Sequence, residues 1–207
     1  AHGLTVTTVA SHEEGKADYS SEVATLASAG GDAVAVLGYL DQGGGMIIKG
    51  SLDAGSFDTF VLSDGMIGDS LTDRFGDALN KSFGSLPGST GAGASTFADV
   101  AKAAGIDSSG PYTGESYDAG ALIVLAMQAG GSADRASIQK NVMGVANAPG
   151  TKIYPGELKK ALDLLSQGKE IDYEGATAVN FTEVGEAFGS FLEKEINGGK
   201  FSTKKQR

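Results

Sequence analysis

Two short apolar runs, separated by a segment of helix length, dominate the N-terminal half of the chain. The runs cover residues 33–37 and 57–62, are rich in β-branched or aromatic residues and are bounded by turn residues, which is typical of strands. The segment between them, roughly residues 42–54, has the length of a helix. This order predicts two parallel strands joined by a right-handed crossover.

Each of these predicted strands is followed by a polar or aromatic residue. Tyr39 follows the first strand and Asp64 follows the second. Because ligands of open α/β sheets bind beyond the carboxyl ends of the strands, we expect Tyr39 and Asp64 to contact a ligand. The residues alone leave two alternatives open: Asp64 equally suits a helix cap or a turn, and Tyr39 equally suits packing at a strand end.

The rest of the pattern predicts an α/β protein with parallel units first, helices in the middle and a strand pair at the end. Residues 4–9 predict a strand, and residues 82–95, rich in Gly and Ser, predict a connection between domains. The helix expected over residues 116–129 is apolar on nearly all sides, which predicts burial. Further helices are expected over residues 19–29, 70–79, 96–104, 134–143 and 157–167, strands over 176–181 and 190–196, and a frayed tail over 203–207.

The composition excludes several kinds of partner and site. A formal net charge of -10 and a pI of about 4.6 argue against nucleic acid and anionic membranes. No run of about 18 apolar residues is present, so we expect no membrane insertion. The opening residues lead straight into the apolar residues 4–9, so we expect no signal peptide in this chain, as in a mature protein. It has no cysteine, which excludes disulfides and thiolate sites.

No motif predicts catalysis, a cofactor or a metal. Gly43-Gly44-Gly45 precedes a helix, but the spacing of the dinucleotide fingerprint is not matched and no Walker lysine follows, which favours a simple helix entry. The two histidines are His2, at the terminus, and His12, in a predicted loop beside two glutamates. His12 could serve as a ligand or a base, although a surface position is the plainer interpretation. A Ser-His-Asp triad is not expected.

Several short segments, in this order, resemble the substrate-binding proteins of branched-chain amino acid ABC transporters. They are Ala17-Asp18-Tyr19-Ser20, Asp32-Ala33-Val34 leading to Gly38-Tyr39, Ser63-Asp64-Gly65, Gly110-Pro111-Tyr112, Ser116-Tyr117-Asp118-Ala119, and Glu174-Gly175-Ala176-Thr177 leading to Phe181-Thr182. The resemblance covers nearly the whole chain. It implies a type I periplasmic binding fold, in which two α/β lobes enclose the ligand.

The resemblance also implies that this chain is an N-terminally truncated fragment. Residues 1–85 and 174–207 would form a three-layer, parallel-sheet second lobe, and residues 86–173 would supply helices of an incomplete first lobe. In the family the missing part holds the ligand carboxylate. Asp64 would hold the ligand ammonium, Tyr39 would be the aromatic residue at the cleft, and Tyr112 would border the side-chain pocket, although packing near the 116–129 helix is its default interpretation.

The predicted function is therefore capture of a small amino acid, branched-chain or similar, in the periplasm and its delivery to an ABC permease, without catalysis. A sensor domain of the same fold that binds an amide or small acid is the alternative. An α/β enzyme would require a catalytic constellation that the sequence does not offer.

Overall fold

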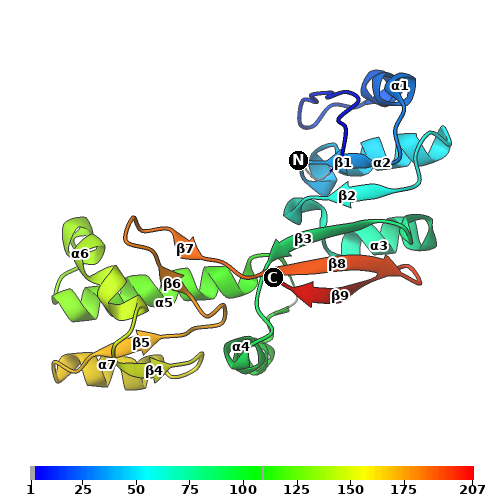
Figure 1. The fold of residues 1–207 in the computed structure, drawn as a ribbon. Coiled ribbons are helices and arrows are strands. Elements are labelled where there is room, and N and C mark those ends of the chain that lie inside the picture. The colour runs from blue at the N-terminus through cyan, green and yellow to red at the C-terminus, as the bar shows by residue number, and fades with distance from the viewer. Residues whose placement is uncertain (1–2, 109) are drawn as a thin grey trace. The chain divides into compact units, whose positions relative to one another are not determined.

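The computed structural model describes residues 3–108 and 110–207 and divides the chain into two compact units (Figure 1). Unit 1 comprises Ala1–Leu86, Leu192–Lys205 and Arg207; unit 2 comprises Pro87–Phe191 and Gln206. The sequence analysis places the return to the first unit at residue 174, whereas residues 174–191 stay with unit 2. Side chains of unit 2 hold this stretch: Asn147 exchanges two hydrogen bonds with the backbone of Phe181.

Unit 1 is built on a five-stranded sheet with the order β1-β2-β3-β8-β9 (Figure 1). Its strands are β1 (Val34–Val36), β2 (Phe60–Leu62), β3 (Phe83–Pro87), β8 (Phe191–Asn197) and β9 (Lys200–Gln206). β1 pairs with β2, and β2 with β3, in parallel. Helix α2 (Gly44–Asp53) connects β1 to β2, so the strand-helix-strand unit and the α/β class predicted from the sequence are confirmed.

The core of unit 1 lies on one face of this sheet. Val34, Val36, Phe60 and Leu62 are buried there, whereas Ala35, on the opposite face, is exposed. The buried face is covered by apolar residues of α2, of α3 (Asp69–Phe75) and of the 3₁₀ turns η2 (Asp64–Met66) and η3 (Gly76–Leu79). Helix α1 (Ser20–Ala29) packs on α2 and ends at Gly30, and η1 (Leu40–Gln42) precedes α2.

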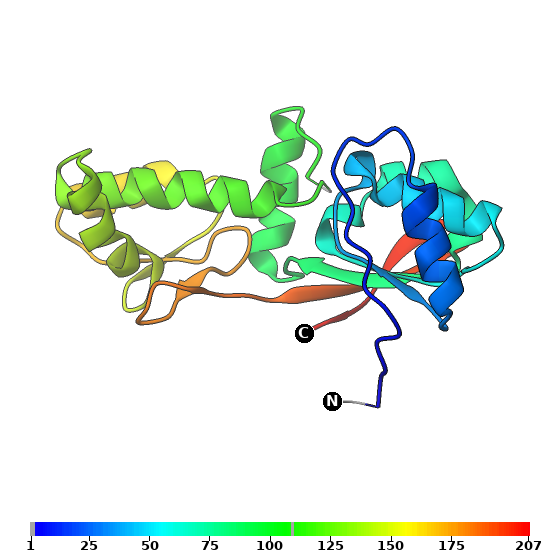
Figure 2. The ribbon, with the colours of Figure 1, turned by 90° about the horizontal axis from the view of Figure 1, so that it is seen from above.

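Residues 4–9 do not form the predicted strand. Leu4, Val6 and Val9 are 90%, 77% and 81% exposed, and Figure 2 shows this dark blue segment running clear of the sheet. The apolar pattern suits a strand, but within the described residues the segment is not paired with any strand, and β1 remains the edge of the sheet. The Thr7 hydroxyl holds the segment near the end of α1 by donating a hydrogen bond to Gly30 O.

Two segments expected to be irregular are strands. β3 lies inside the predicted Gly/Ser-rich connection. It is a strand because its backbone pairs with β2, and this pairing does not depend on the type of side chain. β9 covers most of the predicted frayed tail. The two-residue turn Gly198-Gly199, with φ of 58° and 67°, returns the chain beside β8, and the Lys204–Glu195 ion pair links the two strands.

Unit 2 is mainly helical. Its helices are α4 (Ala92–Ala103), α5 (Thr113–Gly130), α6 (Arg135–Ala146) and α7 (Leu158–Ser166), and its two-stranded sheets pair β4 (Thr151–Ile153) with β5 (Ile171–Tyr173) and β6 (Asn180–Phe181) with β7 (Ala187–Phe188). The predicted strand over 176–181 is thus reduced to two residues. The core combines α5, α6, α7, β4 and β5.

Helix α5 is only partly buried, contrary to the prediction. Leu122, Leu125 and Ala126 face the core, whereas Ile123 and Val124 remain 48% and 46% exposed. α6 and α7 pack on α5, as Figure 1 shows, and the exposed side chains lie off the core-facing side. In the part of the chain that the structure describes, no helix combines the length and the apolar character required to span a membrane.

Candidate functional site

One serine side chain joins the carboxyl ends of β1 and β2 by hydrogen bonds. Ser63 Oγ donates a hydrogen bond to Gly38 O at 3.1 Å and accepts one from Gly38 N at 3.2 Å. Because β1 and β2 are parallel and in register, from Val34 opposite Phe60 to Val36 opposite Leu62, the residues that follow both strands emerge at the same edge. This edge carries Tyr39 and Asp64.

The structure places the Tyr39 ring against Gly65, the residue that follows Asp64. A Cβ atom placed on Gly65 would lie 2.6 Å from Tyr39 Cδ1 and 2.8 Å from Gly38 O, so the Tyr39 ring rests directly on the backbone of Gly65, the residue after Asp64. The Tyr39 side chain is still 52% exposed. Only glycine fits at position 65 without displacing the ring, and the ring therefore presents an accessible aromatic surface next to the turn that Asp64 begins.

The Asp64 carboxylate is half-buried and only partly engaged. Its Oδ1 accepts a hydrogen bond from the backbone N–H of Gly65 at 2.8 Å, a local turn contact. Within residues 3–108 and 110–207 it forms no ion pair. Asp64 is therefore a turn residue with acceptor capacity left over, and its role toward an ammonium group stays a prediction.

The glycines at the start of α2 serve close packing. A Cβ on Gly43 would lie 2.6 Å from the Tyr19 hydroxyl oxygen, and one on Gly45 would lie 2.8 Å from the Arg74 guanidinium. Gly44 and Gly45 are buried, and Gly44 N donates to Tyr39 O. Their backbone is therefore enclosed by the protein, which favours the helix-entry interpretation over a phosphate site.

Tyr112, the third predicted contact, belongs to unit 2. It precedes α5 with a left-handed φ of 62° and is half-buried. Ser109, the residue before the Gly110-Pro111-Tyr112 segment, and the terminal His2 lie outside the described residues. The role of Tyr112 at a side-chain pocket stays a prediction.

A further residue, Asp118 on α5, organises a buried polar cluster that the sequence analysis did not assign. Asp118 is 2% exposed. Its Oδ1 accepts hydrogen bonds from the Tyr173 hydroxyl and Ala176 N, and its Oδ2 from Thr177 N and Thr177 Oγ1, at 2.7–2.9 Å. An acidic residue next to the apolar stretch of this helix was the signal in the sequence. The carboxylate clamps the loop after β5.

Electrostatics in this cluster follow from burial. Desolvation, the Asp118 charge and the hydrogen bond to Asp118 raise the pKa of Tyr173 far above its usual value, so the phenol stays protonated as a donor. Burial, opposed by a backbone hydrogen bond, raises the pKa of Glu115 as well, with a contribution from the Asp118 charge. The Asp118 cluster has a structural role, because all four hydrogen bonds that Asp118 accepts come from β5 and the loop that follows it.

The Tyr39 side of this edge is exposed to solvent. Two surface hollows, of about 480 and 370 Å³, are lined by residues 98–108 and by residues 80–83 with residues of β8 and β9, and neither includes Tyr39 or Asp64. Among the described residues, no group of three His, Asp or Glu side chains could hold a metal ion. The chemistry that this edge can support is recognition of a polar, cationic group beside an aromatic ring.

No protein-family model matches the chain. The chain is 30% identical over 95 residues to the chemotactic signal transduction system substrate-binding protein BasB of Halobacterium salinarum; this match covers 45% of the chain and 23% of that protein.

Solved structures show the fold. The leucine-binding protein LivK of Thermotoga maritima is 18% identical, with a TM-score of 0.68 over 93% of this chain and 49% of that one. A type 1 periplasmic binding protein of Bordetella pertussis is 18% identical, with a TM-score of 0.64 over 92% of this chain and 50% of that one. A putative branched-chain amino acid ABC transporter protein of Rhodospirillum rubrum is 13% identical, with a TM-score of 0.55 over 91% of this chain and 49% of that one. The chain has the type 1 periplasmic binding fold and spans about half the length of these proteins.

Proposed function

We propose that this chain is part of an extracytoplasmic solute-binding protein that captures a small amino acid, branched-chain or of similar size, and delivers it to an ABC permease. The observation that carries the proposal is the Tyr39 ring lying on Gly65 beside the partly free Asp64 carboxylate, at the carboxyl edge of parallel strands. The fold shared with a leucine-binding protein supports it.

In this proposal Asp64 pairs with the ligand ammonium and Tyr39 covers its apolar part. Tyr112 borders the ligand side chain. The hydroxyl and backbone groups that hold the ligand carboxylate belong to polypeptide outside this sequence, and closure of two lobes about a hinge encloses the ligand. Such a protein needs neither nucleophile nor general base, and the described edge offers no pair of side chains arranged for either role.

A sensor role is the second candidate, and the similarity to a chemotaxis substrate-binding protein favours it. Capture and sensing share the same ligand contacts, so binding alone does not separate them. Deletion of the gene distinguishes them: a transport protein leaves a defect in uptake of the labelled amino acid, whereas a sensor leaves a defect in the behavioural response with uptake intact.

Titration of the ¹⁵N-labelled chain with leucine, isoleucine, valine and small amides tests the proposal. One half of a site binds weakly, so millimolar dissociation constants, about -4 kcal/mol, are expected. Asp64→Asn keeps the shape of the side chain but removes the charge that faces the cation. We expect a loss of roughly 2–5 kcal/mol in the closed, two-lobed protein and a proportionate weakening in the chain alone.

Tyr39→Ala should cost less, about 1–3 kcal/mol, because it removes mainly apolar contact. Asp58→Asn is the matched control: it lies just before β2, at the opposite end of the strand from Asp64, and forms a surface ion pair with Lys81. Circular dichroism monitors folding. Equal binding by Asp64→Asn, Asp58→Asn and the parent would refute the ammonium role, and a preference for ligands without an amine would refute the amino acid assignment.

A further inference from the structure

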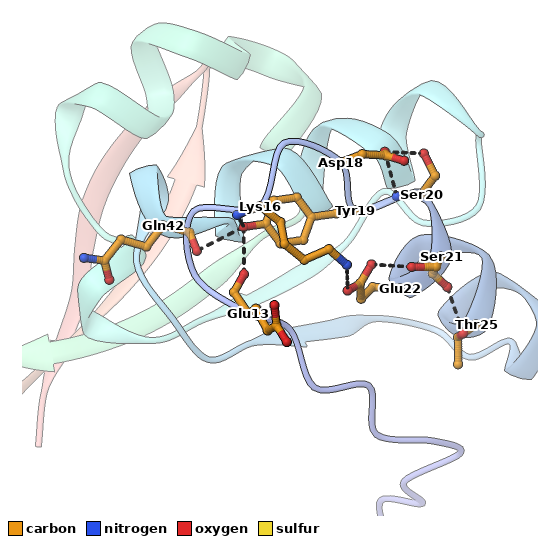
Figure 3. A network of polar contacts seen from close by, with 9 residues as sticks. All are labelled: Glu13, Lys16, Asp18, Tyr19, Ser20, Ser21, Glu22, Thr25 and Gln42. Atoms are coloured by element: carbon orange, nitrogen blue, oxygen red, sulfur yellow. Dashed lines mark hydrogen bonds and ion pairs between the residues drawn. The ribbon is translucent and has the colours of Figure 1, made fainter.

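A buried tyrosine holds the loop before α1 against η1, the short turn that follows β1. Tyr19 is 3% exposed; its hydroxyl oxygen accepts a hydrogen bond from Lys16 N at 3.1 Å and lies 3.0 Å from Glu13 O and 3.5 Å from Gln42 O, the acceptors for its own proton (Figure 3). The Lys16–Glu22 ion pair ties the same loop to α1 (Figure 3). The loop is therefore fixed by contacts on both sides, and His12 lies beside its first anchored residue.

The His12 ring occupies the space above Gly38. A Cβ on Gly38 would lie 3.4 Å from His12 Cε1 and 3.5 Å from His12 Nε2. The ring also stands edge-on to Tyr19, with centroids 5.8 Å apart. Gly38 is the residue that Ser63 fastens to the end of β2, directly before Tyr39. His12 thus reaches the same edge as Tyr39 and Asp64 from a third segment of the chain.

The ring nitrogens of His12 are not engaged by the described protein. The ring is half-buried, and no hydrogen bond or ion pair joins it to residues 3–108 or 110–207. The adjoining Glu13 and Glu14 do not complete a metal site with it, since no described group of three ligating side chains exists. An imidazole that is held in place but lacks a polar partner has an N–H donor available to a ligand.

We propose that His12 is a third ligand-contacting residue at this edge and donates a hydrogen bond to an acceptor oxygen of the bound amino acid. This inference rests on the proposed function and deepens it, because it adds a donor to the acceptor of Asp64 and the ring of Tyr39. The oxygen belongs either to the carboxylate common to all amino acids or to a polar side chain, and the ligand chosen as a probe separates the two.

The test compares the parent chain with His12→Phe, which keeps a ring against Tyr19 and Gly38 but has no donor. Leucine and glutamine are the probes, titrated at millimolar concentrations and followed by the imidazole ¹⁵N signals. The chain has only two histidines, so His2→Phe assigns the signals and serves as the matched control. His12→Gln restores a donor and should recover part of the binding.

We expect about tenfold weaker binding by His12→Phe, the typical effect of one hydrogen bond to a charged or polar group, and a shift of the His12 signal in the parent on addition of ligand. A loss for both probes assigns the contact to the carboxylate, and a loss for glutamine alone assigns it to the side chain. Equal binding by the parent and His12→Phe, with no shift of the His12 signal, overturns this inference alone. Failure of the parent to bind either probe overturns the proposed function together with it.

Discussion

The Asp118 carboxylate should make a large contribution to the stability of unit 2, and Asp118→Asn measures it. The side chain accepts four hydrogen bonds, two on each oxygen, from Tyr173, Ala176 and Thr177. In the asparagine variant one oxygen becomes an NH₂ group that points at two donors. The hydroxyl of such a pair can rotate away, but the backbone N–H of Ala176 or Thr177 cannot.

At least one buried backbone N–H therefore loses its acceptor, which costs about 1–3 kcal/mol. The remaining hydrogen bonds change from a charged to a neutral acceptor, and each loses part of the roughly 1.5–3 kcal/mol typical of charged partners. Relief from burying a charge offsets some of this loss. The expected net destabilisation of unit 2 is about 3 kcal/mol, a large share of the 5–15 kcal/mol typical of a whole domain.

Native-state hydrogen exchange measures this, because amides of each compact unit report separately. We expect faster exchange at Ala176 and Thr177 in Asp118→Asn and unchanged exchange at Val36. Asp163→Asn is the matched control: it removes a carboxylate from α7 that forms an exposed i,i+4 ion pair with Lys159, worth about 0.3–0.5 kcal/mol. Equal, small effects of the two variants would refute the proposed weight of the buried cluster.

Two further predictions follow from the same contacts. The folded-state pKa of Tyr173 is raised, chiefly by burial and then by Asp118, so its contribution to stability is complete below the unfolded-state pKa of about 10 and is lost as the pH rises beyond it. The urea midpoint of unit 2 should therefore fall above that pH in the parent, and Tyr173→Phe should lack this part of the fall. Parallel pH profiles of the two proteins would contradict the prediction. Gly65→Ala places a Cβ 2.6 Å from Tyr39 Cδ1 and 2.8 Å from Gly38 O, so the ring must move; amino acid titrations should show several-fold weaker binding, and unaltered binding would show that the ring position is unimportant.

The sequence by itself determined the local units and the class of the fold. Short apolar runs and turn residues located β1, α2 and β2, and the rule for parallel crossovers placed Tyr39 and Asp64 at one edge. These features depend on neighbours within about thirty residues and on chain handedness, which are written in a local pattern. The helices of unit 2 were also found, with shifted ends, because their periodicity is local.

Only the tertiary structure decided which segments find partners. β3, within a Gly-rich connection, and β9, within a basic tail, are strands because a neighbouring backbone pairs with them, whereas residues 4–9 have a strand pattern but no neighbour. The same holds for single residues. Asp118 is buried by donors about 55–59 positions away, and His12 reaches Gly38 through a loop that Tyr19 fixes. Such non-local contacts leave no periodic trace in the sequence, since they depend on where the backbone brings distant residues together.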